Sequence, residues 1–312
     1  MTVLDGKKTA STIKDEIKRA VDDLKLAGKR VPHLAAVLVG NDGASLTYVG
    51  SKVRSCEYVG FESTLIRLEE TISEDHLLKE INQLNENETI DGYIVQLPLP
   101  KHIDEQKILL SVDPQKDVDG FHPTNFGRMA LEMDAFIPAT PFGILQLLER
   151  YKISTSGKHC VVVGRSHIVG RPISILMSQK GPVGNATVTL AHSRTEDLSS
   201  LTKSADIIVM ALGIPEFLTA SMVKKGAAII DVGITRVPDS SHPKGYVIKG
   251  DVAYDDVAQK ASAMTPVPGG VGPMTIAMLL QNTFLARKEE ANAVSLWLDK
   301  SAELKGQKVR LK

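Results

Sequence analysis

The chain has 312 residues, 43% of them hydrophobic and 24% charged, and 37 basic side chains balance 37 acidic ones. This neutral balance argues against a nucleic-acid partner, because nucleic-acid-binding proteins usually carry a basic excess, and two cysteines are too few for a disulfide framework. Since there is no run of about 18 apolar residues that would predict a membrane span, we expect a cytoplasmic protein of about two domains.

The first part of the chain alternates helical and strand patterns. Apolar residues recur with a helical period over residues 6–27, and the apolar run "HLAAVLVG" then predicts a buried strand. A helix containing "YVGSK" follows, "FESTLIRLEE" predicts a second strand, and residues 74–85 predict another helix. A third strand, "DGYIVQLPLP", ends at prolines. The alternation predicts an α/β layer with a parallel sheet.

Turn residues cluster between residues 111 and 143, which predicts loops there, and a helix is expected over 140–150. The stretch "KHCVVVGRSHIVGRPISILM" then predicts a strand, a glycine turn and a helix. Further apolar strands are expected at "NATVTLAH", "ADIIVMAL", "AAIIDVGI" and "YVIKGDV", and residues 273–286 form an apolar helix. This order predicts two α/β domains, the second a Rossmann-like doubly wound parallel sheet, with a cleft between them.

We place the domain boundary near residues 138–142. Residues 1–139, completed by a C-terminal helix over 273–312, are expected to form the first domain, and residues 140–272 the second. The charged stretch after residue 287 is given no role.

The stretch "VVVGRSHIVGRP" has the layout of a phosphate-binding turn. Gly164 directly follows an apolar strand, and Gly170 stands where the next helix begins. A strand, a tight turn and a helix N-terminus together form a site for a pyrophosphate. Ser166 replaces the middle glycine of the G-x-G-x-x-G pattern, so a plain strand–helix turn without a ligand stays open as an alternative.

The next strand bears on the choice of dinucleotide. NAD-specific proteins place an acidic residue at its end to bind the ribose 2′-hydroxyl, whereas this strand ends in His192, Ser193 and Arg194. A carboxylate would repel a 2′-phosphate, and Arg165 adds a positive charge in the adjacent turn. We therefore favour NADP and keep NAD as an alternative, although Arg194 alone would equally suit a solvated surface.

Tyr48 and Lys52 are four residues apart in a predicted helix, which places both side chains on one face. The Y-x-x-x-K pattern suggests a short-chain dehydrogenase, but in that family it follows the glycine turn, whereas here it precedes Gly164. A lone pair at this spacing is most often packing. Gln96 at a strand end, the carboxylates of "KDVDGF" and the segment "TPVPGGVGPMT" make a ligand site the better interpretation.

These stretches, together with "PATPFG", "IDVGI" and "GDVAYDD", resemble the bifunctional methylenetetrahydrofolate dehydrogenase/methenyltetrahydrofolate cyclohydrolase family over residues 1–286. The resemblance implies oxidation of 5,10-methylenetetrahydrofolate with NADP, followed by hydrolysis of 5,10-methenyltetrahydrofolate to 10-formyltetrahydrofolate. It also implies that the first domain is the folate-binding catalytic domain, that the second binds NADP, and that the protein is a homodimer.

The resemblance further implies roles for particular residues. Lys52 would be the central catalytic lysine, Tyr48 would stack on the folate, Gln96 would tune the lysine, and Asp119 would hold the pterin ring. Further substrate-binding positions would be Val95, Leu97, Pro268, Gly269 and Gly270. The cofactor-binding positions would be Gly164, Arg165, Ser166, Ser193, Arg194 and Ile234. Cys56, one turn after Lys52, is interpreted as a packing residue, and the histidine and cysteine spacing implies no metal.

Three alternative functions stay open. The chain could be an NADP-dependent dehydrogenase of another small substrate, an enzyme with only one of the two folate activities, or a non-catalytic nucleotide sensor. Thermal stabilisation of the protein by folate would distinguish a bifunctional folate enzyme from a dehydrogenase of another substrate. Formation of NADPH would distinguish an enzyme from a sensor.

Overall fold

The computed structural model describes residues 1–287, which divide into two compact units. Unit 1 consists of Met1–Arg19 and Asp119–Leu279, and unit 2 consists of Ala20–Val118 and the described residues from Leu280 onward. The α/β class predicted from the sequence is confirmed, because each unit contains a parallel sheet. The part of the expected C-terminal helix from residue 288 onward lies outside the described residues.

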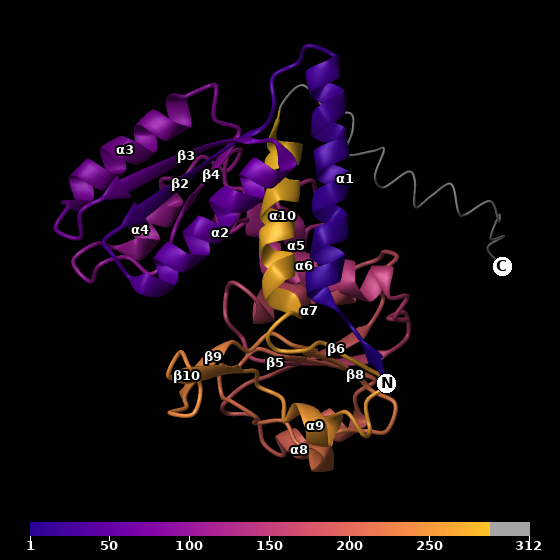
Figure 1. The fold of residues 1–312 in the computed structure, drawn as a ribbon. Helices are drawn as coiled ribbons and strands as arrows, with labels where there is room; N and C mark the ends of the chain where they lie inside the picture. Colours follow the sequence, from indigo (N-terminus) through magenta and orange to yellow (C-terminus); the bar gives the residue numbers. More distant parts are fainter. Residues whose placement is uncertain (288–312) are drawn as a thin grey trace. The chain divides into compact units, whose positions relative to one another are not determined.

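Unit 2 contains a three-stranded sheet in the order β3-β2-β4 (Figure 1). The strands are β2 (His33–Val39), β3 (Glu62–Leu68) and β4 (Gly92–Val95), and both pairings are parallel. Val37 illustrates the central place of β2, since it lies opposite Ile66 on one side and Val95 on the other. A central parallel strand is covered on both faces, which explains why β2 is a continuous apolar run.

Three helices accompany this sheet. Helix α2 (Gly43–Val59) begins after Asp42, whose carboxylate accepts a 2.8 Å hydrogen bond from the Ser45 N–H, and it ends at Gly60, where φ is 80°. Helices α3 (Glu74–Glu86) and α4 (Glu105–Leu110) pack against the face of β2 that carries Ala35 and Val37. Their buried contacts come from Leu77, Ile81, Leu84 and Ile108. The sequence pattern had not indicated α4.

Unit 1 contains a six-stranded sheet in the order β1-β11-β8-β7-β5-β6, with every neighbouring pair parallel. Its strands are β1 (Thr2–Val3), β5 (His159–Val163), β6 (Thr187–Ala191), β7 (Ile207–Met210), β8 (Ala228–Asp231) and β11 (Ala263–Met264). The direction of winding reverses at β5, which lies between β6 and β7. In such sheets ligands bind at the carboxyl ends of the strands on either side of this reversal.

Helices cover both faces of this sheet, as expected for a doubly wound fold (Figure 1). Helix α7 (Gly170–Ser178) contacts β5 and β6 on one face. The other face packs against α8 (Leu198–Ser204), the 3-10 helix η1 (Ala220–Met222) and α9 (Tyr254–Val257). The remaining helices with residues in unit 1 are α1 (Gly6–Leu26), α5 (Pro123–Ala130), α6 (Ala139–Arg150) and α10 (Val271–Ala286).

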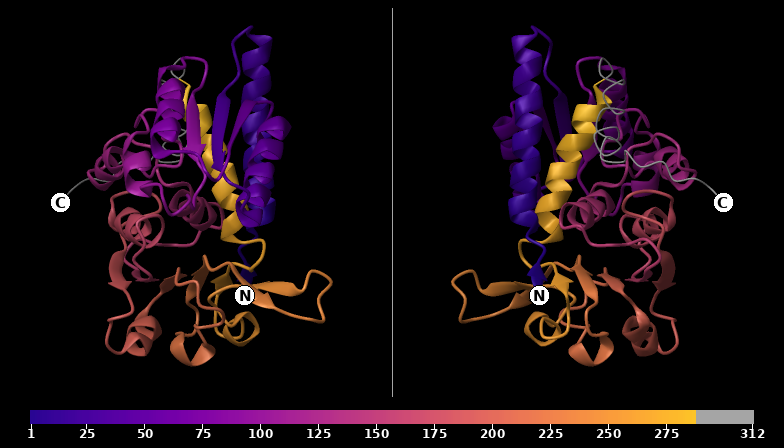
Figure 2. Two further views of the ribbon diagram at one scale, coloured as in Figure 1. Left: turned by 90° about the vertical axis from the view of Figure 1, so that its left-hand side faces the viewer. Right: turned by 90° about the vertical axis from the view of Figure 1, so that its right-hand side faces the viewer.

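One strand expectation needs correction, and two short strands had not been expected. The stretch "YVIKGDV" does not join the parallel sheet, because β10 (Tyr246–Lys249) pairs antiparallel with β9 (Thr235–Pro238) in a separate hairpin. Figure 2 shows this orange hairpin extending from the six-stranded sheet. The outer sheet positions belong instead to β11 and β1, which are only two residues long and carry no readable periodicity.

A helix also lies inside the region expected to be loops. Helix α5 begins at Pro123, and the His122 side chain accepts a 3.1 Å hydrogen bond from the Thr124 N–H. Its buried residues are Asn125 and Met129, so packing stabilises a helix that proline and glycine content had argued against.

Among residues 1–287, no helix combines the length and the hydropathy that a membrane crossing requires.

Candidate active site and dinucleotide-binding loops

Lys52 lies in the middle of α2, and only 6% of its surface is exposed. Its Nζ donates a 3.2 Å hydrogen bond to Gln96 Oε1 and lies 5.2 Å from the centroid of the Tyr48 ring. Gln96 directly follows β4, and its own Nε2 donates to the Leu97 carbonyl at 2.8 Å. This second bond turns the amide oxygen of Gln96 toward Lys52. The result is a buried amine at the carboxyl edge of the sheet, beside an aromatic ring.

Three residues beside Lys52 or its partner Gln96 in the chain differ in what they offer a ligand. Val95 is 6% exposed and belongs to the hydrophobic core, so only its main chain is available for substrate contact. Leu97 is half-buried. Cys56 is 1% exposed, and burial raises the pKa of its thiol to about 12, although the nearby Lys52 charge acts in the opposite direction. A neutral, buried thiol fits the packing interpretation of Cys56.

Asp119 lies in unit 1, where it is half-buried and precedes a tight turn. Gly120 has φ of 72°, and a Cβ at that position would lie 2.7 Å from the Pro138 nitrogen. A side chain at Gly120 would therefore both strain the backbone and collide with the neighbouring segment. Glycine lets the turn pack against Pro138, which restricts where the Asp119 carboxylate lies.

The segment 268–270 packs against the beginning of α1. A Cβ on Gly6 would lie only 1.7 Å from the Gly270 carbonyl oxygen, so the two backbones are in close contact. Ile234, which is 58% exposed, lies near the start of α10, since its Cδ1 would be 3.2 Å from a Cβ on Gly272. Within unit 1, the structure thus brings one predicted cofactor residue close to the predicted proline–glycine segment.

The glycine turn after β5 is shaped by close backbone packing. Gly164 has φ of 122°, and its Cβ would lie 2.2 Å from the Ala211 carbonyl oxygen. A Cβ on Gly170 would lie 2.0 Å from the Gly164 carbonyl oxygen. Ser166 Oγ accepts hydrogen bonds from the Val169 and Gly170 N–H groups, at 3.2 and 3.3 Å, and so caps the start of α7. A turn with glycine at both close backbone contacts, directly before a helix N-terminus, fits a pyrophosphate.

The basic and hydroxyl side chains predicted to contact the cofactor are exposed around this turn. Arg165 lies within it, and Ser193 and Arg194 follow β6. The Gly164 N–H donates a 2.9 Å hydrogen bond to the Ala191 carbonyl, which joins the two loops at the carboxyl edge. The donors fit the phosphate groups of a dinucleotide.

Three isoleucines are exposed along the same edge. Ile168, Ile214 and Ile234 follow β5, β7 and β8, and their exposed fractions are 48%, 49% and 58%. Apolar side chains beside a polar turn suit the planar rings of a dinucleotide. The sequence analysis predicted only Ile234. The other two could have been predicted in the same way, because each isoleucine follows the end of a predicted strand by a few residues.

Within residues 1–287, no three His, Cys, Asp or Glu side chains are grouped in a way that could hold a metal ion.

The doubly wound sheet, the glycine turn and the basic donors define a dinucleotide-binding α/β protein that also carries a buried lysine centre. Two family models match the chain. The catalytic domain of tetrahydrofolate dehydrogenase/cyclohydrolase matches residues 4–119, and the NAD(P)-binding domain of the same enzyme matches residues 138–291. The chain belongs to the tetrahydrofolate dehydrogenase/cyclohydrolase family, which confirms the resemblance seen in the sequence.

Individual proteins agree with this assignment. The bifunctional protein FolD of Flavobacterium johnsoniae is 72% identical over 288 residues, covering 92% of this chain and 98% of that protein. The solved FolD methylenetetrahydrofolate dehydrogenase/cyclohydrolase of Campylobacter jejuni is 45% identical, with a TM-score of 0.87 and coverage of 93% and 99%. The Trypanosoma brucei enzyme, solved with NADP and an inhibitor, is 36% identical, with a TM-score of 0.88 and coverage of 94% and 99%.

Proposed function

We propose that this chain catalyses two successive reactions of folate one-carbon metabolism. It oxidises 5,10-methylenetetrahydrofolate to 5,10-methenyltetrahydrofolate with NADP, and it hydrolyses the product to 10-formyltetrahydrofolate. The observation that carries the proposal is the buried Lys52 amine held by Gln96, in a chain that matches both the catalytic and the NAD(P)-binding family models. We assign folate binding and catalysis to residues 1–139, and NADP binding to residues 140–272.

The first reaction removes a hydride from the methylene carbon of the substrate, and nitrogen lone pairs stabilise the amidinium cation that remains. The nicotinamide of NADP supplies the hydride acceptor when it is bound. The chain must hold the substrate in one orientation, and positioning of this kind contributes much of the rate enhancement in enzymes. We assign that task to stacking by Tyr48, to the Asp119 carboxylate on the pterin ring, and to the backbone of the 268–270 segment.

The second reaction needs proton transfer at two points. Water adds to the amidinium carbon and loses a proton, and the ring then opens as a proton reaches the departing nitrogen. Lys52 in its neutral form accepts the first proton, and the resulting ammonium supplies the second, so one group serves both steps. Gln96 Oε1 accepts a hydrogen bond from Lys52 Nζ and restrains its position during the exchange.

We assign NADP binding to the loops at the carboxyl edge of the unit 1 sheet. The Gly164–Ser166 turn would hold the pyrophosphate, with Arg165 supplying positive charge. Ser193 and Arg194 would bind the 2′-phosphate, which favours NADP over NAD. Ile234 would contact the cofactor rings from the loop after β8. The fit rests on the packed glycine turn and on the exposed donors around it.

The direct test is an absorbance assay on the purified protein. With 5,10-methylenetetrahydrofolate we expect NADPH to form, more efficiently with NADP than NADH does with NAD. With 5,10-methenyltetrahydrofolate and no dinucleotide, we expect hydrolysis to 10-formyltetrahydrofolate. NADPH formation without hydrolysis would reduce the function to a single activity. Absence of both reactions, combined with retained NADP binding, would support a nucleotide sensor instead.

We also propose a cytoplasmic homodimer. Both cysteines are buried free thiols, as in proteins of reducing compartments. Light scattering should give twice the mass of one chain, and a monomer mass at assay concentration would reject the dimer.

A further inference from the structure

Two buried carboxylates lie next to each other in unit 1. Asp231 is the last residue of β8 and is 3% exposed, and Asp251 follows β10 by two residues and is 0% exposed. The Asp251 N–H donates a 2.9 Å hydrogen bond to Asp231 Oδ1. Neither residue has a role in the proposed chemistry, and carboxylates are rarely buried completely unless polar partners compensate them.

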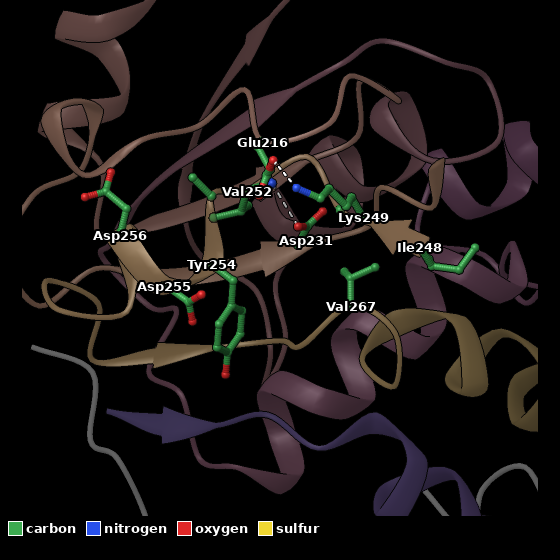
Figure 3. A pocket seen from close by; sticks show the side chains of 11 residues that line it. Glu216, Asp231, Ile248, Lys249, Val252, Tyr254, Asp255, Asp256 and Val267 are labelled. Atoms are coloured by element: carbon green, nitrogen blue, oxygen red, sulfur yellow. Dashed lines mark hydrogen bonds and ion pairs between the residues drawn. The ribbon is translucent and has the colours of Figure 1, made fainter. Parts of the chain in front are cut away.

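Asp231 organises the backbone around the end of β8. Its Oδ1 also accepts a hydrogen bond from the Gly233 N–H, and its Oδ2 accepts one from the Val252 N–H, each at 2.9 Å. Figure 3 shows Asp231 beside Val252, at the wall of a pocket that also contains the Lys249–Glu216 ion pair. The Asp231 carboxylate thereby joins the loop after β8 to the segment that carries Asp251.

Asp251 holds the loop after β7. Its Oδ2 accepts hydrogen bonds from the Leu212 and Gly213 N–H groups, at 2.6 and 3.1 Å. Its Oδ1 is buried, has no hydrogen-bond partner among the described residues, and would lie 2.4 Å from a Cβ on Gly233. A Cβ on Gly250 would lie 2.0 Å from Asp231 Oδ2. Glycines therefore enclose both carboxylates at distances that no other residue would permit.

The loop held by Asp251 supports the glycine turn. Ala211 begins this loop, and its N–H donates to the Val163 carbonyl at 2.9 Å. The Ala211 carbonyl oxygen is the atom that a Cβ on Gly164 would approach to 2.2 Å, so the turn lies directly against the loop. The loops after β5 and β7 flank the reversal point of the sheet, where a dinucleotide binds in this fold.

We propose that Asp251, bonded to Asp231, is a positioning residue for the dinucleotide. It fixes the 211–213 loop, and this loop in turn supports the Gly164 turn that faces the pyrophosphate. This inference rests on the proposed NADP-dependent function. Asp251 acts through backbone groups and does not itself touch the substrate. Its loss therefore weakens NADP binding and leaves the cyclohydrolase reaction, which needs no dinucleotide, unchanged.

The test is Asp251→Asn, which keeps the shape of the side chain. A neutral acceptor makes weaker hydrogen bonds than a carboxylate, so we expect the Kd for NADP, measured by titration calorimetry, to rise about tenfold. The dehydrogenase KM for NADP should rise in parallel, while kcat/KM for cyclohydrolysis stays within about twofold. Asp251→Ala removes the oxygen that accepts from the Leu212 and Gly213 N–H groups, and should raise the Kd further.

Asp206→Asn is the matched control. Asp206 immediately precedes β7 at the amino edge of the same sheet, and its carboxylate accepts a 3.0 Å hydrogen bond from the His159 N–H. This variant should lose thermal stability without a change in the Kd for NADP. An unchanged Kd in folded Asp251→Asn, an equal rise in Asp206→Asn, or a matching loss of cyclohydrolase activity would overturn the proposal. Calorimetry measures NADP binding without any reaction, so failure of the folate chemistry would not be mistaken for failure of this inference.

Discussion

Lys52 Nζ and Gln96 Oε1 lie 3.2 Å apart, although 44 residues separate them in the chain. Lys52 comes from the middle of α2, and Gln96 comes from the end of β4, beyond the last residue of the strand. The Gln96 N–H still donates to the Val37 carbonyl at 2.9 Å, so the amide side chain starts from a fixed backbone. A rigid acceptor beside a buried amine is the arrangement that acid–base chemistry requires.

Replacing Lys52 should separate catalysis from cofactor binding. Lys52→Met removes the proton carrier, and we expect cyclohydrolase activity to be abolished and dehydrogenase kcat to fall at least about 100-fold, the usual range for an acid–base group. The Kd for NADP should not change. Arg54→Met, an exposed position of the same helix, should behave as wild type. Normal hydrolysis of methenyltetrahydrofolate by Lys52→Met would remove the lysine from the mechanism.

Gln96→Glu tests the partner of the lysine. A carboxylate at this position would favour the charged ammonium form of Lys52 and so withdraw the base from the cyclohydrolase step. We expect cyclohydrolase kcat at neutral pH to fall, and the alkaline part of the pH–rate profile to rise toward wild type. Gln96→Met has no charge and should lower kcat without moving the profile. Identical profiles for the two variants would show that charge at this position is irrelevant.

Arg194→Ala tests the choice of dinucleotide. Loss of a charged hydrogen-bond donor from a phosphate site should raise the KM for NADP about tenfold, which corresponds to about 1.4 kcal/mol. The KM for NAD should stay the same, because NAD has no 2′-phosphate. Lys158→Ala removes an exposed charge at the opposite, amino edge of the sheet, just before β5, and is the control. Equal effects on NADP and NAD would place Arg194 away from the 2′-phosphate.

Asp231 should make stability depend on pH. Burial, and secondarily the Asp251 charge, raise the pKa of this carboxyl from 3.8 to about 6, against the effect of its backbone hydrogen bonds. The folded protein therefore keeps a proton that the unfolded chain has already lost, so the contribution of Asp231 to stability decreases as pH rises from about 4 to 6. By linkage, a shift of about two units corresponds to about 3 kcal/mol.

Asp231→Asn removes this titration but also replaces one acceptor oxygen with an NH2 group that faces backbone N–H donors, so the variant should be less stable than wild type at pH 4. Its deficit in the free energy of unfolding should shrink by up to about 3 kcal/mol as the pH rises past 6. Denaturant unfolding of both proteins at a series of pH values measures this difference in the free energy of unfolding. A deficit that stays constant between pH 4 and 7 would contradict the raised pKa.

Cys56→Ala should separate packing from chemistry beside the active lysine. A buried thiol whose pKa is raised to about 12 is a poor nucleophile, so both activities should stay within about twofold of wild type. The lost packing should lower the free energy of unfolding by about 1 kcal/mol. The control is Cys160→Ala, because this thiol is also buried, with a pKa raised to about 12, and is far from Lys52 in the chain. Loss of cyclohydrolase activity in Cys56→Ala alone would reject the packing interpretation.

The sequence predicted the main strands because buried parallel strands are continuous apolar runs. The runs that become β2, β5, β7 and β8 needed no knowledge of their partners to be recognised. The two-residue strands β1 and β11 escaped detection because only their place beside β8 defines them. Helix α5 was missed for a related reason. Its local sequence favours turns, and the helix is stabilised by tertiary packing, including burial of Met129.

For the site, the order of the motifs and the identities of their residues were enough to indicate the family, the dinucleotide and the residues proposed to bind or catalyse. They were not enough to show which groups meet. A lysine, a glutamine and a glycine turn in an α/β chain can be recognised from the residues alone. The folded chain was needed to show that Lys52 lies against Gln96 and that the Asp251 N–H is bonded to the Asp231 carboxylate beneath the cofactor loops. Such contacts join segments distant in sequence, and local patterns carry no information about them until the sheets are assembled.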